Sequence, residues 1–362
     1  MDINVPQNES YSLQRQYLPL GKIGGLPAWL NPVTLPTLDE LTCPTCKKQM
    51  AFLMQIYCTD QTDPTFAFHR TIYLFLCRNP ECSKPNDASN FVAFRCQLPR
   101  ANGFYSSESA LDPTVVGEVA DPFYNESTYA KLCAVCGCSA GKKCARCTKR
   151  WYCCRDHQVI DWNREHKSTC GNNEAGDITT STLTNDFLFP EFAVDMHHLN
   201  FEVDLMEADS SSEDDEENEG EKLLRCIAQL KKFENVENGI TPNDLEGLEE
   251  FAKDEAFNNF HNVISRNPEQ ILRYEKNGNP LLASDHAPEP NDIPPCHICG
   301  SSRRFEFQLT PHLVSLLGVD SPGQSIDWAT VMVFTCSQTC RMNDDGYGKE
   351  FVFKQDFTNS VE

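Results

Sequence analysis

The stretch CAVCGCSAGKKCARCTKRWYCCRDHQVIDWNREHKSTC, residues 133–170, contains ten thiol and imidazole groups, and eight of them are arranged as four pairs. Two or three other residues separate the members of each pair. Zinc takes four N or S ligands in a tetrahedron, and so short a spacing lets one knuckle or helical turn supply two of them. His166 and Cys170 are four residues apart and would share one face of a helix. The stretch therefore predicts two zinc ions.

The alternating order of the pairs predicts a cross-braced arrangement. One site would contain Cys133, Cys136, Cys153 and His157, and the other Cys144, Cys147, His166 and Cys170. So short a segment buries too little apolar surface to fold alone, and zinc can supply on the order of 10 kcal/mol of its folding energy. The pattern resembles the MYND zinc finger, whose usual sixth ligand is cysteine. Here that position is His157, with Cys154 nearby as a competing ligand.

The composition favours a basic protein as the partner. The chain has 362 residues, of which 40% are hydrophobic, which is enough for two or three small domains. Its net charge of −22 disfavours nucleic acid as the main partner, because phosphate binding needs clustered Lys and Arg. The same charge would steer a basic protein towards the chain over a long range.

The nineteen cysteines are expected to be reduced. The beginning of the chain, MDINVPQNESYSLQRQ, has no apolar signal-peptide core, and no run is long enough to cross a membrane. We therefore expect a cytoplasmic and nuclear protein, in which paired cysteines indicate metal sites.

Upstream of the finger, residues 21–105 predict a β-rich zinc-ribbon-like unit. The strand-like runs AFLMQIY (51–57), TIYLFL (71–76) and FVAFR (91–95) alternate with two cysteine pairs. The expected zinc ligands are Cys43, Cys46, Cys77 and Cys82. The preceding GKIGGLPAWL (21–30) is either a binding loop or a segment that tucks Trp29 into the domain.

The far end of the chain, residues 293–357, has the same order of parts. FEFQL (305–309), ATVMVF (329–334) and FVFK (351–354) alternate with two further cysteine pairs. The expected ligands are Cys296, Cys299, Cys336 and Cys340. We interpret this as an internal repeat. Each copy alone would leave one sheet face uncovered, so we expect 293–357 to pack on 21–105 with everything between them looped out. The alternative is two separate ribbons on a string.

The segment between the finger and the second unit changes composition twice. Residues 186–221 contain fourteen Asp or Glu and no Lys or Arg, which predicts a disordered acidic linker. It is either a docking surface for a basic partner or a solubilising linker, and Phe187 to Phe192 could anchor what the acids attract. Residues 222–282 predict a helical segment, because Leu245 to Val263 form an apolar stripe at helical spacing that is either core or a partner groove. The whole chain is therefore expected to be α+β.

Several stretches in the same order resemble one known family. They are KIGGLPAW (22–29), CPTCKKQMAFLMQIY (43–57), AFHRTIYLFLC (67–77), FRCQLPR (94–100), PEQILRY (268–274), CHICGSSRRFEFQL (296–309) and FTCSQTC (334–340), together with the finger. This is similar to the programmed cell death protein 2 family. The resemblance implies a non-enzymatic chaperone that captures a basic small-subunit protein, ribosomal protein S2, and supports 40S ribosome biogenesis. It also implies links to cell proliferation, stem-cell maintenance and cell death.

An enzymatic function is disfavoured by the zinc ligands themselves. A catalytic zinc keeps an open position, whereas all sixteen ligands here can be assigned to four filled sites. His69 and Arg70 form a basic pair next to an expected strand, and a hydrogen-bonded structural histidine is a simpler interpretation than a catalytic base.

A peptide adapter is the alternative function. Some MYND fingers bind proline-containing peptides through a Gln and a Trp, and these match Gln158 and Trp162. Trp162 could equally pack against the finger's own small core. The finger has nine Lys or Arg against three acids between Lys131 and Cys170, so a basic client would bind the two-ribbon body and the acidic linker instead.

Overall fold

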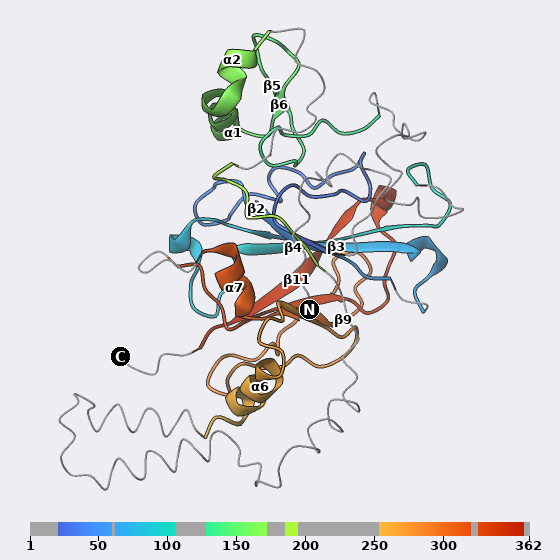
Figure 1. Cartoon of the computed structure of the whole chain (residues 1–362). Coiled ribbons are helices and arrows are strands. Elements are labelled where there is room, and N and C mark those ends of the chain that lie inside the picture. The colour runs from blue at the N-terminus through green and yellow to red at the C-terminus, as the bar shows by residue number, and fades with distance from the viewer. Residues whose placement is uncertain are drawn as a thin grey trace, which may run out of the picture.

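A computed structural model describes residues 21–59, 62–105, 128–171, 185–194, 253–319 and 325–357 (Figure 1). Within these residues one antiparallel sheet has the strand order β7-β1-β2-β3-β4-β11-β10-β9-β8. Its strands are β1 (Gly21–Ile23), β2 (Ala51–Tyr57), β3 (His69–Leu76), β4 (Phe91–Leu98), β7 (Phe192–Ala193), β8 (Leu272–Tyr274), β9 (Arg303–Leu309), β10 (Thr330–Cys336) and β11 (Tyr347–Gln355).

The central strands bury both of their faces. In β3, Ile72 and Leu74 point into one apolar cluster while Tyr73 and Phe75 point into another. Successive side chains of a strand point to opposite faces, so this uninterrupted apolar run is what a strand covered on both sides requires. The β-branched and aromatic content of these runs is the reason that the sequence identifies them as strands.

The two repeated units form one sheet. β4 of the first unit pairs with β11 of the second, with Ala93 opposite Glu350 and Cys96 opposite Tyr347. The expected β-rich body made of two units is confirmed. Its construction differs from simple stacking, because the copies join edge to edge and so satisfy the backbone groups that two exposed edge strands would leave unpaired.

The sheet is also strongly curled. Arg70 on β3 contacts Glu306 on β9, although three strands lie between them in the sheet order. The concave face therefore encloses a shared core, to which Leu74 of the first unit and Phe307 and Val331 of the second contribute. Because the sheet curls, the apolar side chains of the two units are buried against each other.

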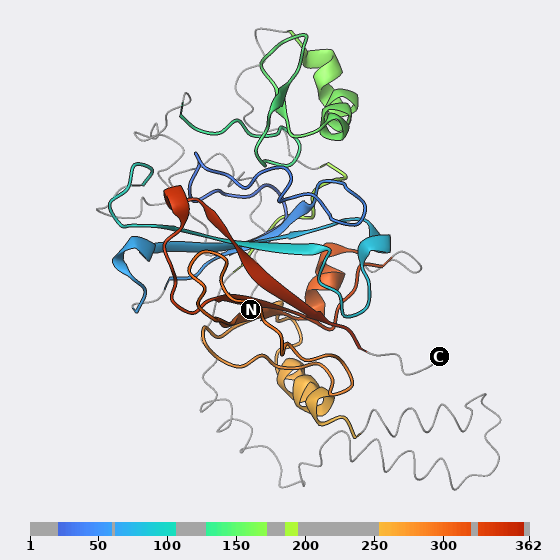
Figure 2. The ribbon, with the colours of Figure 1, turned by 180° about the vertical axis from the view of Figure 1, so that it is seen from behind.

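The finger lies over the opposite face of the sheet, at one end of the molecule (Figures 1 and 2). It consists of β5 (Lys142–Lys143), β6 (Trp151–Tyr152), α1 (Arg155–Asp161), a π-helical turn (Trp162–His166) and α2 (Lys167–Thr169). Tyr73, Phe75 and Phe94 of the sheet belong to the same apolar cluster as Val135 and Tyr152 of the finger. The finger is therefore packed on the body.

Two further helices cover the second unit. α7 (His312–Leu317) buries Leu313 and Leu317 in the shared core and ends at Gly318, whose φ of 64° forms the left-handed C-cap. α6 (Glu255–Ser265) begins at Asp254, whose side chain accepts a hydrogen bond from the Phe257 N–H at 2.8 Å. Short 3-10 turns occur at Thr65–Ala67, Pro80–Cys82 and Asn343–Asp345.

The segment between finger and second unit differs partly from its prediction. α6 confirms that it contains a short helix, and Phe260 of the apolar stripe is buried there as core. The end of the expected helical segment 222–282 forms strand β8 instead, because Leu272 to Tyr274 pair with β9. Likewise, residues 192–193 of the expected acidic linker form β7 on β1. Residues 195–252, which hold most of the acidic linker and the first half of the helical segment, and residues 1–20 lie outside the described residues.

Among the described residues, no helix is both long and apolar enough to span a membrane.

Candidate metal centres

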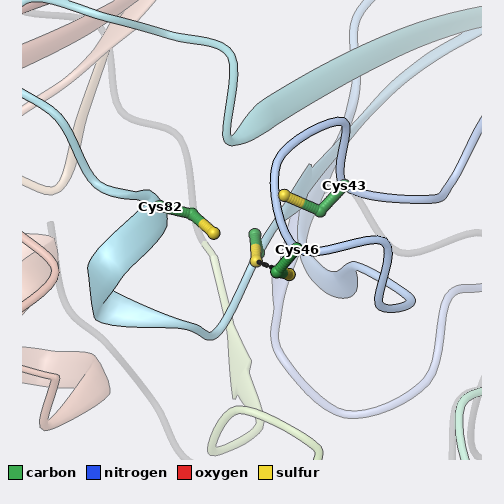
Figure 3. A group of neighbouring side chains, drawn as sticks. Cys43, Cys46 and Cys82 are labelled. Atoms are coloured by element: carbon green, nitrogen blue, oxygen red, sulfur yellow. Dashed lines mark hydrogen bonds between the residues drawn. The ribbon is translucent and has the colours of Figure 1, made fainter.

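The first cysteine quartet lies at one end of the β2–β3 hairpin. Cys43 and Cys46 form a tight knuckle before β2, in which the Lys47 N–H donates to the Cys43 carbonyl at 3.0 Å. Cys77 follows β3 directly, and Cys82 ends the 3-10 turn after it. Figure 3 shows the sulfurs of Cys43, Cys46 and Cys82 turned towards one another. The Sγ atoms of Cys46 and Cys77 are 3.5 Å apart, and all four sulfurs lie within 4.8 Å of one another.

The second unit repeats this arrangement. Sγ of Cys296 is 3.6 Å from Sγ of Cys340, and Sγ of Cys299 is 3.5 Å from Sγ of Cys336. Zn–S bonds of about 2.3 Å at tetrahedral angles would separate two sulfurs by about 3.8 Å. The quartets therefore have the size of a zinc site.

The finger contains the two cross-braced sets. In the proximal site, next to the body, Nδ1 of His157 is 3.1 Å from Sγ of Cys153 and 3.5 Å from Sγ of Cys133. In the distal site, Nε2 of His166 is 3.5 Å from Sγ of Cys147. The proximal set is Cys133, Cys136, Cys153 and His157, and the distal set is Cys144, Cys147, His166 and Cys170.

Cys154 is not part of the proximal set. Its side chain accepts a hydrogen bond from the His157 backbone N–H at 3.5 Å, which makes it the N-cap of α1. This contact orients the first helical turn that carries His157 to its site. The structure thus places His157, rather than its competitor, among the zinc ligands.

All sixteen predicted ligands are brought together in the four predicted sets. Each set supplies four S or N donors at zinc-like spacing, so the chain fits four structural zinc ions. Four protein ligands fill a tetrahedron and leave no position open for water or substrate. The sites therefore stabilise the fold.

Trp29 joins the finger to the body. Its indole N–H donates to the Gly137 carbonyl of the proximal knuckle at 2.7 Å, and its ring stacks on Tyr73 with centroids 5.1 Å apart. Gly137 has a φ of 68°, and a Cβ there would come within 3.1 Å of Pro27. The GKIGGLPAWL segment therefore tucks its Trp into the domain and, in addition, holds the finger.

A second connection is the strap, residues 185–194. Asn185 Nδ2 donates to the Val135 carbonyl at 3.2 Å, and the Phe187 ring lies 4.2 Å from the ring of the zinc ligand His157. Phe189 is buried in the shared core. The sequence predicts that these aromatic residues belong to an acidic linker, and the signal against that prediction is the presence of three phenylalanines, Phe187, Phe189 and Phe192, within six residues.

The strap passes close to the two glycines of the GKIGGLPAWL segment, Gly24 and Gly25. Gly24 has a φ of 61°, and a Cβ there would lie 1.9 Å from the Pro190 carbonyl oxygen. Gly25 has the same φ and faces Glu191, whose carboxylate pairs with the buried Lys22 ammonium at 3.0 Å.

Arg70 connects the two repeated units. Its guanidinium binds both carboxylate oxygens of Glu306, and Tyr274 donates to the same carboxylate at 3.1 Å. Burial tends to raise the pKa of Glu306, but the Arg70 charge and the hydrogen bonds from Arg70 and Thr335 outweigh it and lower that pKa. Neighbouring His69 bonds the Tyr57 hydroxyl through Nδ1 at 2.9 Å, and burial lowers the pKa of His69. The contacts of His69 and Arg70 are thus structural, and neither residue is placed as a catalytic base.

Gln158 and Trp162 lie one turn apart on α1 and the π-helical turn after it. Both are half-buried. The Trp162 ring packs edge-on against the ring of the zinc ligand His166, with centroids 5.7 Å apart. Trp162 therefore belongs to the finger's own packing while keeping part of its surface accessible.

Comparison with known proteins agrees with this architecture. Family models of the N-terminal and C-terminal domains of Programmed cell death protein 2 match residues 4–112 and 254–356, and the MYND finger model matches 133–170. Programmed cell death protein 2 of Bos taurus is 37% identical over 358 residues, which cover 97% of this chain and 95% of that protein. The chain belongs to the programmed cell death protein 2 family.

Two further relatives cover very different shares of the chain. The Mus musculus protein is 35% identical over 97% of this chain and 94% of its own length. The Probable 20S rRNA accumulation protein 4 of Schizosaccharomyces pombe is 38% identical over 114 residues, 27% of this chain and 28% of its own. No solved structure matches the chain. The family resemblance of the sequence motifs is confirmed.

Proposed function

We propose that this chain is a non-enzymatic chaperone that captures a basic protein of the small ribosomal subunit, with ribosomal protein S2 as the expected client. The observation that carries the proposal is the net charge of −22, together with a run of residues, 186–221, that has fourteen acids and no basic residue. A free ribosomal protein carries dense Lys and Arg that must be shielded before assembly. The name of the Schizosaccharomyces pombe relative, which refers to 20S rRNA, supports a role in 40S biogenesis.

The zinc sites support binding rather than catalysis. Each has four protein donors, and a catalytic zinc needs an open position. The body they stabilise is a continuous curved sheet with a fixed finger, which offers a large and rigid surface. A rigid surface loses little conformational entropy on binding, so a pre-organised body suits a chaperone that must hold one client.

The client would bind the body and the acidic run rather than the finger. Lys142, Lys143 and Arg146 are exposed on the finger and would repel a basic protein. We therefore assign capture to the two-unit body, with the acidic run steering the encounter. The same proposal places the chain in the cytoplasm and nucleus, with consequences for proliferation and stem-cell maintenance that follow from ribosome supply.

Co-purification with the full chain tests the proposal. Proteins retained at low and at high salt would be identified by mass spectrometry. We expect ribosomal protein S2 to be enriched at both, and more strongly at low salt. Absence of any small-subunit ribosomal protein at low salt would contradict the proposal.

The second candidate function is an adapter for proline-containing peptides in transcription or cell-death regulation. It is favoured by Gln158 and Trp162, which lie one turn apart and keep part of their surface accessible. The full chain and a Trp162→Ala variant would be compared in binding to proline-containing peptides. Binding that the variant abolishes, in a protein that ignores ribosomal protein S2, would favour the adapter.

A further inference from the structure

The distal end of the finger has the opposite charge to the rest of the chain. Lys142 and Lys143 precede the distal zinc ligand Cys144, Arg146 lies between Cys144 and Cys147, and Lys167 follows His166. All four side chains are exposed. We call them the distal cations, and each is a close neighbour in the chain of a ligand of the distal zinc site.

The finger's acids do not cancel these charges. The buried Asp161 accepts from Arg150 at 2.8 Å and from the Tyr152 hydroxyl at 2.6 Å. Glu165 is bound by the same Arg150 at 3.0 Å. Arg164 contacts the same two carboxylates at 3.5 and 3.6 Å, so Asp161 and Glu165 are balanced by two arginines of the finger itself. The third acid, Asp156, is next to the proximal ligand His157.

The distal cations belong to the end of the finger that is turned away from the described part of the body. The proximal knuckle contacts the body through Trp29 and Phe187, whereas α2 lies at the end of the finger that points away from it (Figures 1 and 2). At physiological salt, charges separated by more than about 8 Å are largely screened from each other. A polyanion can therefore approach this end without meeting the full repulsion of the body that the structure describes.

We infer that the distal cations bind the phosphate backbone of RNA. Protein interfaces have an apolar core, but the one large apolar side chain that is strongly exposed within the described part of the finger is Val159 on α1. Phosphate contacts need only cations, and they are made without an apolar anchor. The surface therefore suits RNA better than an acidic protein. The inference does not depend on the proposed client, because it rests on the finger's charges alone.

The test is fluorescence anisotropy of a labelled single-stranded oligouridylate of about 20 nucleotides with the full zinc-loaded chain, at about 50 and 200 mM salt. We expect a Kd on the order of micromolar at the lower salt. The variant Lys142→Glu/Lys143→Glu should bind roughly tenfold more weakly and should lose about 1.4 from the slope of log Kd against log salt, which corresponds to two lost phosphate contacts.

The matched control is Lys47→Glu/Lys48→Glu. These lysines are also exposed in a zinc knuckle, and the double variant changes the net charge by the same amount. We expect it to bind RNA like the original chain, and zinc content is measured for both variants. If the finger variant loses zinc, Arg146→Gln/Lys167→Gln replaces it, with a loss of similar size expected.

Three results would overturn the inference. One is an equal loss of RNA affinity in the two matched variants, which would indicate an effect of net charge. Another is the absence of RNA binding at the lower salt. The third is a polyglutamate peptide that displaces the RNA at equal concentration, since the surface would then be a site for acidic proteins.

Discussion

Arg70 and Glu306 form a buried ion pair although 236 residues separate them in the chain. One belongs to the first repeated unit and the other to the second, and both side chains are fully excluded from solvent. A buried ion pair does not by itself guarantee stability, but a single partner left alone is an uncompensated buried charge. The pair therefore requires that the two units occupy one fixed relative position.

The first prediction concerns this pair. Glu306→Gln should lower the free energy of unfolding by about 3–5 kcal/mol, because Arg70 would stay buried without a counter-charge. The matched control is Glu275→Gln, which removes a half-exposed partner of Arg273 and should change stability by less than about 1 kcal/mol. Urea denaturation measures both. Equal effects of the two substitutions would contradict the role assigned to Glu306.

The same pair predicts a pH dependence. The pKa of Glu306 is lower in the folded chain than its ordinary value. Its contribution to stability is therefore fully present above the ordinary glutamate pKa of about 4.3 and is lost as the pH falls through the lower folded pKa. Glu306→Gln should flatten the decline of stability in this acid range, as followed by urea denaturation at several pH values. An unchanged acid profile would exclude this carboxylate as its source.

A third prediction separates backbone strain from steric contact. Gly24→Ala places a Cβ 1.9 Å from the Pro190 carbonyl oxygen, whereas Gly300 has a comparable φ of 73° with no atom within 4 Å of a Cβ. Gly300→Ala should cost about 1–2 kcal/mol from the left-handed backbone alone. Gly24→Ala should cost more and should release the strap, seen as faster hydrogen exchange in residues 185–194. Similar stabilities of the two variants would show that close contact between Gly24 and the strap does not matter for stability.

The finger should loosen when Trp29 is removed. Trp29→Ala deletes the hydrogen bond to Gly137 and leaves a cavity against Tyr73 and Phe75, at a cost of about 3–5 kcal/mol. Hydrogen exchange in residues 133–140 should accelerate. Phe68→Ala, at an aromatic residue that is 46% exposed, should leave this exchange unchanged. Unchanged hydrogen exchange in residues 133–140 of the Trp29→Ala variant would show that Trp29 does not hold the finger on the body.

Metal content is the most direct check of the four sites. Elemental analysis should find four zinc ions per chain. Cys299→Ser should lose one of them and destabilise the second unit, because a site that loses a thiolate loses much of its binding energy. Cys154→Ser should keep all four, since its sulfur caps α1. A chain with only two zinc ions would limit metal binding to the finger.

The sequence was sufficient for the zinc sites because ligand spacing is local. Pairs such as Cys43 and Cys46, or His166 and Cys170, must be close whatever the rest of the chain does. The repeat was visible for the same reason, since each copy carries its own cysteine and strand pattern.

Long-range contacts were not predictable from these local patterns. Nothing in the neighbourhood of Arg70 indicates Glu306, and nothing near β4 indicates that its edge pairs with β11. The strap could not be predicted because Phe187 and Phe189 are followed by many acidic residues, which dominate the local composition of the segment. PEQILRY lacks strand alternation of useful length, so β8 became recognisable only beside β9.

Capture of the client by the body and the acidic run is the central feature of the proposed function. The most direct measurement is the association and dissociation rate of ribosomal protein S2 at low and high salt, for three chains. The first is the original chain, and in the second the eleven acids of 202–221 are changed to Asn and Gln. The third is the variant Gln158→Ala/Trp162→Ala, which is called the finger variant in this comparison. Steering by charge acts on association, so neutralising the run should slow association and flatten its salt dependence, while the finger variant should bind unchanged. An unchanged association rate in the neutralised chain, with binding lost in the finger variant, would contradict the account and favour the peptide adapter.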